Sequence, residues 1–132
     1  MTTKTISKAA LSAATLDFLR DLAQNNNRDW FQANRARYDA AKAEFEEFIT
    51  RVLHRINATQ PLGTTTAKDC IFRINRDVRF ARDKSPYKLN LAAGIGAGGR
   101  KSGHIDYYFH LQPNGETFIG AGMYQPTPAE LA

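Results

Sequence analysis

Apolar residues recur at intervals of three and four positions between residues 15 and 58, the spacing that gathers them on one face of a helix. Leu16, Leu19 and Leu22 follow this spacing in the first stretch. The asparagines at 25–27 then end it, because asparagine side chains compete with the helix for backbone hydrogen bonds. The pattern predicts a helical region over residues 15–58, preceded by a loose leader over residues 1–14.

Two further helices are expected within this region. Asn27 can cap a short helix, because its side chain can accept a hydrogen bond from a free N–H group in the first turn. A longer helix is predicted from about Arg35 to Ala58, where the apolar residues form one continuous stripe. The stripe consists of Tyr38, Ala41, Phe45, Phe48, Ile49, Val52, Leu53 and Ile56. The charged residues of this helix occupy other faces, which is typical of a solvated surface.

After Pro61 the helical spacing gives way to strand-like patterns. Short strands are predicted over residues 70–75 and 88–96. Residues 104–112 alternate most regularly, with four apolar side chains on one face and polar ones on the other. The apolar set is Ile105, Tyr107, Phe109 and Leu111. The sequence Pro-Asn-Gly at 113–115 predicts a turn that pairs this strand with residues 116–124 as a hairpin.

Helices followed by strands predict an α+β domain in which N-terminal helices pack on a mainly antiparallel sheet. Residues 1–132 are expected to form a single domain, with its β-rich part over residues 70–124. Thr127 and Pro128 resemble the start of another helix. We therefore expect the natural domain to continue past residue 132, so that this chain lacks a C-terminal portion.

Composition narrows the class of protein without naming a reaction. The chain is 42% hydrophobic and 23% charged, as globular domains commonly are. Its one cysteine, Cys70, cannot form an internal disulfide and is expected to be a buried, inert thiol. No stretch is long and apolar enough to span a membrane, so we expect a cytoplasmic protein without a membrane partner.

The positive charge is concentrated in one segment. The chain carries a net charge of +5, whereas residues 68–101 alone hold nine Lys or Arg against three Asp. The rest of the chain is therefore slightly acidic. A local excess of this kind favours a site for an anion over a general affinity for polyanions.

Residues 73–88 hold most of this excess. We predict that five side chains there bind an anionic ligand bearing phosphate or carboxylate groups, because arginine matches these groups with a rigid fork of donors. They are Arg73, Arg76, Arg79, Lys84 and Tyr87. Asp77 and Asp83 would orient the cations through charge-assisted hydrogen bonds, and Asp77 is also a candidate catalytic base. Folding back at residues 83–86 would bring the two halves together.

The same residues resemble the RxxRDxRFxxDKxxY signature of a widespread bacterial family of uncharacterised proteins, a domain of unknown function. The residues from Phe18 to Asn26, the pair Trp30-Phe31 and residues 107–111 are also similar to that family. Its members extend past the end of this chain. The resemblance implies no activity, cofactor or reaction, so whether the protein is an enzyme stays open.

Two alternatives compete with the anion site. The motif can instead be a structural network of ion pairs in a protein-interaction module, with further partners such as Glu44 or Glu47. The basic segment 68–101 can also bind nucleic acid, which we rank second because it lacks a recognition helix. An aromatic platform for bases would need strand-borne rings among basic residues, and Tyr107, Tyr108 and Phe109 fit this only in part.

Two weaker patterns complete the candidates. Gly94, Gly96 and Gly99 form a G-x-G-x-x-G sequence, but no helix is predicted after it, so we expect a flexible connection between strands. His104 and Asp106 share a strand face and are weak candidates for metal ligands. We predict neither a bound metal nor a cofactor.

Overall fold

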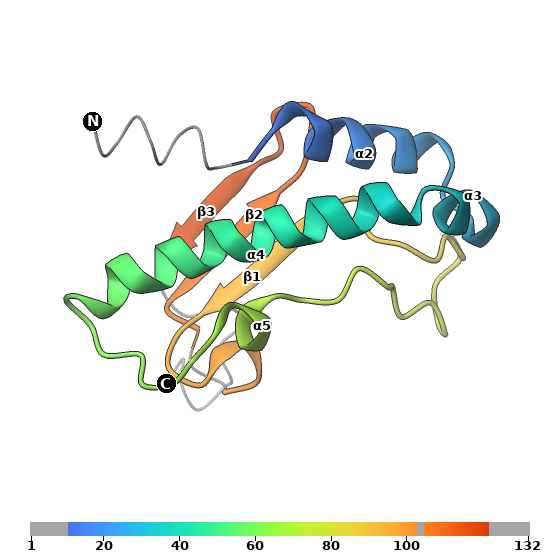
Figure 1. Ribbon diagram of the computed structural model, residues 1–132. Helices are drawn as coiled ribbons and strands as arrows, with labels where there is room; N and C mark the ends of the chain where they lie inside the picture. The colour runs from blue at the N-terminus through green and yellow to red at the C-terminus, as the bar shows by residue number, and fades with distance from the viewer. Residues whose placement is uncertain (1–10, 103–104, 122–132) are drawn as a thin grey trace.

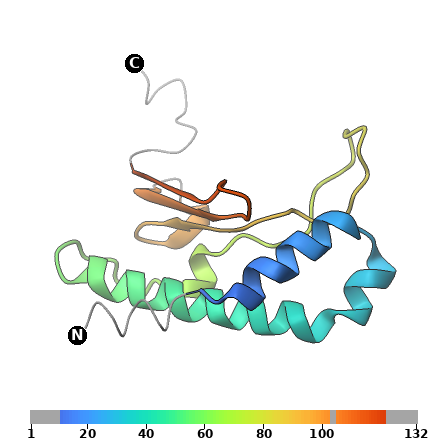
Figure 2. The same cartoon turned by 90° about the horizontal axis from the view of Figure 1, so that it is seen from above.

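A computed structural model describes residues 11–102 and 105–121 of the chain. Three helices form one layer and a three-stranded antiparallel sheet forms the other, which confirms the α+β prediction. Figure 2 shows the two layers edge-on, with the helices on one side and the sheet on the other. No helix among the described residues is long and apolar enough to cross a membrane.

The helical layer follows the predicted order. Helix α2 spans Ala13–Gln24, α3 spans Arg28–Ala33 and α4 spans Arg35–Asn57. The side chain of Asn27 accepts a hydrogen bond from the backbone N–H of Trp30 at 2.8 Å, as its capping role requires. Helix α2 begins slightly before the expected boundary, inside the predicted leader.

The core forms where the stripe of α4 meets the sheet (Figure 1). Phe45 and Ile49 are fully buried, and Phe45 and Phe48 both contact the ring of Phe109 on the sheet. Helix α2 adds Phe18, Leu19 and Leu22 to the same core. Cys70 is buried as well, and burial raises the pKa of its thiol, as expected for an inert side chain.

The sheet has the order β1-β2-β3, with β1 over Leu91–Ile95, β2 over Tyr107–Leu111 and β3 over Phe118–Ala121. All five residues of β1 are buried. The turn between β2 and β3 contains Asn114 and Gly115 with φ of 66° and 78°, the left-handed geometry that these residue types adopt most readily. The predicted hairpin is therefore present.

The predicted strand at 70–75 was wrong. A short helix, α5, spans Ala67–Cys70, and the following residues make only the isolated bridge Ile71↔Ala93 and the bridge Asn75↔Tyr87. The chain leaves the sheet edge after Phe72, whose N–H donates to Ala92 O. A regular strand needs a partner along its whole length, and here two partners share the segment.

Residues 76–86 form a hairpin-like projection, which we call the arm. Its base is closed by the Asn75↔Tyr87 bridge and by the hydrogen bond from Arg76 N–H to Pro86 O. Asn26 holds the base to the helical layer, since its side chain donates to Tyr87 O at 2.8 Å and accepts from Tyr87 N–H at 3.1 Å. Figure 2 shows the arm projecting away from the helices, on the side of the sheet.

Candidate functional site

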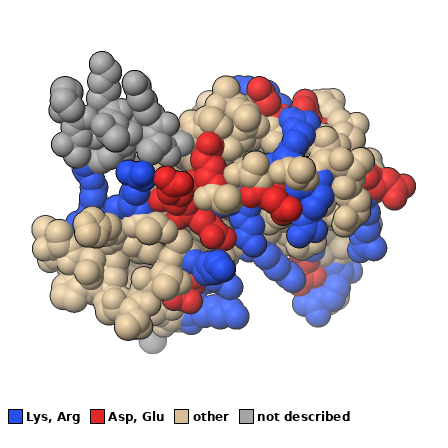
Figure 3. Space-filling model, viewed as in Figure 1, with Lys and Arg blue, Asp and Glu red and all other residues tan. Residues whose placement is uncertain are grey.

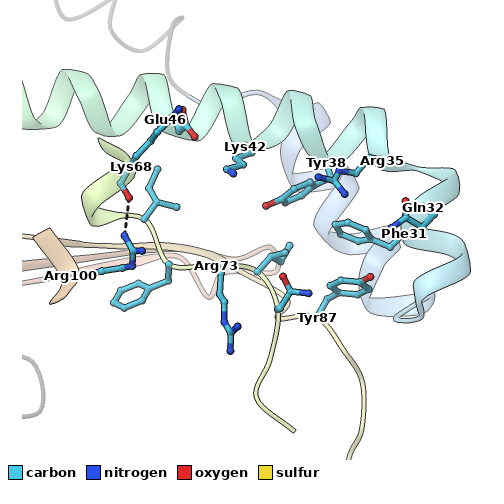
Figure 4. A pocket seen from close by; sticks show the side chains of 14 residues that line it. Phe31, Gln32, Arg35, Tyr38, Lys42, Glu46, Lys68, Arg73, Tyr87 and Arg100 are labelled. Atoms are coloured by element: carbon cyan, nitrogen blue, oxygen red, sulfur yellow. Dashed lines mark hydrogen bonds between the residues drawn. The ribbon is translucent and has the colours of Figure 1, made fainter. Parts of the chain in front are cut away.

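A cavity of about 530 Å³ lies between α4, α5, the extended segment 71–75 and the short 3-10 helix η1 at Gly99–Lys101 (Figure 4). Figure 3 shows Lys and Arg side chains around a hollow in this face of the molecule. The charged residues that line the cavity are Arg35, Lys42, Glu46, Lys68, Arg73 and Arg100. Five of them are cations and one is an acid, so the cavity has a strongly positive lining.

Three of the cations are open to a ligand. Among the described residues, the ammonium groups of Lys42 and Lys68 and the guanidinium of Arg73 have no hydrogen-bond or ion-pair partner. Lys42 comes from the middle of α4, and Arg73 comes from the segment that leaves the sheet edge, with its side chain pointing away from α4 (Figure 4). Cations of one sign in one hollow concentrate their field there, which favours an anion over water or cations.

Two other cations are held in place by the protein. Arg35 pairs with Asp39 at 3.1 Å and lies 5.5 Å from the centre of the Tyr38 ring. Arg100 Nη1 donates to the carbonyls of Lys68 and Asp69 at 2.8 and 2.9 Å. A guanidinium has five N–H donors, so both arginines keep donors for a ligand.

Gly99 explains why Arg100 reaches α5. Its φ of 81° is left-handed, and a Cβ there would overlap the carbonyl group of Asp69. Glycine thus allows η1 and α5 to approach closely. Asp69 is itself fixed in a capping box with Thr66, whose backbone and side-chain hydrogen bonds lower the pKa of the Asp69 carboxyl.

Tyr38 is a site residue that sequence reasoning missed. Its ring belongs to the buried aromatic cluster with Phe18 and Phe31, as its place in the apolar stripe predicts. Its hydroxyl, however, points into the cavity (Figure 4). Burial raises the pKa of the phenol above its ordinary value of 10.0, so the group is a neutral hydrogen-bond donor near neutral pH. A polar-tipped ring in a stripe of Phe and Ile was the available signal.

The structure divides the predicted ligand-binding residues between two places. Arg73 and Tyr87 line the cavity, and the Tyr87 ring stacks on Phe31 with centroids 4.1 Å apart. The other three, Arg76, Arg79 and Lys84, lie in the arm and do not line the cavity.

Three of the four cations of the arm are occupied by the arm itself. Arg76 Nη1 donates to the carbonyls of Ser85 and Asp83 at 2.9 and 3.3 Å. Lys84 Nζ donates to Val78 O at 2.6 Å. These hydrogen bonds connect the two sides of the arm and fix its shape.

The two predicted orienting acids also lie in the arm. Asp77 accepts two side-chain hydrogen bonds from Arg79, at 3.0 and 2.9 Å, and they lower the pKa of its carboxyl. Hydrogen bonds from the Ser85 side chain and backbone lower the pKa of Asp83. Asp77 does not line the cavity.

The suggested acidic partners from α4 are engaged elsewhere. Glu44 accepts hydrogen bonds from Ser12 and Thr15, and Glu47 pairs with Arg51 on its own helix. The expectation that they balance the arm was therefore wrong. Both acids face the N-terminal helix or solvent, so the arm takes its acceptors from its own backbone.

The remaining candidates show no site among the residues that the structure describes. The G-x-G-x-x-G sequence leads into the three-residue η1, which is too short to receive a dinucleotide as an α-helix would. His104 lies outside the described residues, and Asp106 accepts a hydrogen bond from Gln60 at 3.3 Å. No group of three potential metal ligands occurs within residues 11–102 and 105–121.

Comparison with known proteins gives a family and no activity. The family model described as a conserved hypothetical protein (DUF2461) matches residues 14–132. The match confirms the resemblance to a family of uncharacterised proteins, and it spans both the cavity and the arm. Neither the curated proteins nor the solved structures gave a match. The cavity's chemistry therefore has to be inferred from its residues.

Proposed function

This chain belongs to the DUF2461 family of conserved hypothetical proteins, and we propose that it binds a small molecule bearing phosphate or carboxylate groups in the cavity beside α4. The observation that carries the proposal is the lining of five cations against one acid, with Lys42 and Arg73 unpartnered in the described part of the chain. The volume of about 530 Å³ is within the range of small-molecule sites.

Each lining group has a physical role in this proposal. Lys42 supplies a point charge, while Arg73 can hold a phosphate or carboxylate with two parallel hydrogen bonds. The Arg100 side chain is already held by its hydrogen bonds to two carbonyls, so it loses little conformational entropy when a ligand binds. Tyr38 donates a neutral hydrogen bond that adds no further charge to the site.

The cavity is favoured over the arm as the anion site because fewer of its cations already have acceptors within the protein. In the arm, guanidinium and ammonium groups already donate to nearby carbonyls and carboxylates. In the cavity, an incoming anion would replace only water around Lys42 and Arg73. Of the sequence-predicted set, the proposal therefore keeps Arg73 and Tyr87 and adds Arg35, Lys42, Lys68, Arg100 and Tyr38.

Thermal unfolding in phosphate and in citrate, against chloride at constant ionic strength, tests the proposal. A ligand at ten times its Kd stabilises the folded state by about 1.4 kcal/mol, which raises Tm by about 5 °C for a chain of this size. Lys42→Ala should remove most of this increase. Lys84→Ala, which removes the same charge from the arm, should keep it.

Three results would count against the proposal. The first is an unchanged Tm in both anions, since specific binding to the folded state must stabilise it. The second is an equal increase for the wild type and Lys42→Ala, which would move the effect away from the cavity. A loss with Lys84→Ala alone would return the site to the arm.

A further inference from the structure

The face of the sheet that points away from the helices carries a row of rings. Tyr108 and His110 alternate with the core-facing residues of β2, and Phe118 on β3 lies beside both. The Phe118 ring stacks on His110 with centroids 4.8 Å apart and lies 5.6 Å from Tyr108. Phe72 extends the row on the other side, 6.3 Å from Tyr108. Phe118 is 51% exposed, so one end of the row is open to solvent.

The arm offers a second exposed ring among cations. Phe80 is 95% exposed, with the Arg79 guanidinium 5.7 Å from its ring centre. Arg82 is exposed and has no partner among the described residues. The internal hydrogen bonds of Arg76 and Lys84 fix the arm, so it presents Phe80 and Arg82 in a preformed way.

A groove of about 390 Å³ joins the arm to the ring row. Arg76, Asp83 and Lys88 line its arm side, Gln112 lines its sheet side, and Ala23 and Asn26 line its helical side. Lys88 Nζ donates one hydrogen bond to Arg73 O at 2.8 Å and lies 5.6 Å from the centre of the Phe72 ring, so the ammonium keeps two further donors. Gln112 Oε1 is 2.7 Å from His110 Nε2, within the ring row itself. The groove thus runs from the base of the arm to the end of β2, and Figure 2 shows the arm and the sheet on the same side of the helical layer.

We propose that this surface binds single-stranded nucleic acid, with Phe118 and Phe80 stacking on bases and Arg82 and Lys88 contacting phosphates. Rings beside cations are the combination that single strands need, because every base has a flat face and every linkage a negative charge. Tyr108, His110 and Gln112 place a chain of hydrogen-bonded polar groups beside the rings, and Gln112 continues it to Glu116. They suit the edges of bases and would be poorly placed against lipid chains or an apolar protein groove.

This inference can be tested separately from the cavity: Phe72 borders both, but the open cation Lys42 lies on α4 and takes no part in the surface. It also restricts the predicted nucleic-acid site from the whole basic segment 68–101 to one face of the sheet and the arm. Single strands are favoured over duplexes, because no helix within the described part of the chain projects toward this face to enter a major groove (Figure 2).

Fluorescence anisotropy with labelled twelve-nucleotide dT and rU oligonucleotides, at several KCl concentrations, tests the proposal. Phe118→Ala should weaken binding by between about 5-fold and about 150-fold, the range for losing one stacked base. Ile119→Ala is the matched control, because it removes an exposed apolar side chain from the same strand but from the face that pairs with Phe109. It should leave the affinity unchanged.

The charged contacts need their own control. Arg82→Ala should reduce the slope of log Kobs against log salt by about 0.7, the share of one phosphate in a single strand. Arg28→Ala removes an exposed arginine from the helical side and should leave that slope unchanged. Lys42→Ala should also bind the oligonucleotides normally, which separates this surface from the cavity.

Three outcomes would overturn the proposal. One is the absence of binding to either oligonucleotide at low salt. Another is equal loss with Phe118→Ala and Ile119→Ala, which would reflect general destabilisation of the sheet. The third is binding to anionic lipid vesicles, abolished by Phe80→Ala, without binding to oligonucleotides, which would assign the arm to a lipid surface.

Discussion

Glu44 joins the start of α2 to the middle of α4, and removing its carboxylate should destabilise the fold markedly. Its Oε1 atom accepts hydrogen bonds from Thr15 Oγ1 at 2.6 Å and from Ser12 N–H at 2.7 Å. Thr15 is only 3% exposed, so water replaces the lost acceptor of its hydroxyl less readily than at an exposed residue. Ser12 is exposed, and water can replace what it loses.

The expected magnitude follows from that difference in burial. Leaving a buried hydroxyl without an acceptor costs about 1–3 kcal/mol, whereas the exposed Ser12 bonds contribute little. Glu44→Ala should therefore lower the free energy of unfolding by about 2 kcal/mol and Tm by about 8 °C. Glu47→Ala on the same helix removes only an exposed pair with Arg51 and should cost about 0.3–0.5 kcal/mol.

The pH dependence gives a sharper test of the same bond. Burial of Glu44 raises its pKa, but hydrogen bonds from Ser12 and Thr15 outweigh this and hold the pKa below the ordinary 4.5. A carboxyl with a lowered folded-state pKa stabilises the protein above its unfolded pKa, and loses that contribution as pH falls through the folded one. In urea unfolding, the difference in free energy of unfolding between the wild type and Glu44→Gln should thus be constant from pH 8 to about pH 5.5. It should shrink below about pH 4.5. A gap independent of pH, or an equal loss with Glu47→Ala, would refute the reasoning.

Two further variants probe the cavity wall and the arm. Gly99→Ala should lower the free energy of unfolding by about 2–4 kcal/mol in urea, because left-handed strain adds to overlap with Asp69. Gly63 also has a left-handed backbone but open space around it, so Gly63→Ala should lower the free energy of unfolding by only about 1–2 kcal/mol. Equal losses for the two variants would contradict a role for the contact between Gly99 and Asp69. Asp77→Ala should leave Tm within about 2 °C of the wild type, because its pair with Arg79 is exposed. It should speed trypsin cleavage after Arg79 or Arg82, and global unfolding would instead make the arm a scaffold for the whole domain.

The helices and the hairpin could be predicted because their signals are local. The stripe on α4 repeats over about five turns, and Asn27 and Asn114 each act within a few residues of their own position. The strand predicted at 70–75 was wrong because the conformation of this segment depends on partners that are distant in the sequence. Ile71 bridges to Ala93 while Asn75 bridges to Tyr87, and nothing in the segment itself shows that the chain leaves the sheet between them.

The cavity could not be predicted because its residues are ordinary when taken one at a time. Lys42 is one exposed cation on a helix rich in charges, and Lys68 and Arg100 lie about thirty residues apart in the sequence. Their convergence depends on Gly99 letting η1 pack on α5, a tertiary contact without a local signature. Only Arg73 and Tyr87 were found in advance, because they belong to a motif with its own charge excess.

In the arm, the same charge excess is largely balanced by acceptors of the arm itself, and the reason is general. Counting acids and bases treats carboxylates as the only partners of a cation. In the arm, Arg76 and Lys84 instead donate to the backbone carbonyls of Ser85 and Val78, which carry no formal charge and so never enter such a count. A tight hairpin exposes carbonyls that a sheet would have paired, and long basic side chains can reach back to them. An excess of cations in a segment rich in turns therefore indicates self-bonding as readily as a ligand, and the test is whether the carbonyls beside each cation are otherwise free.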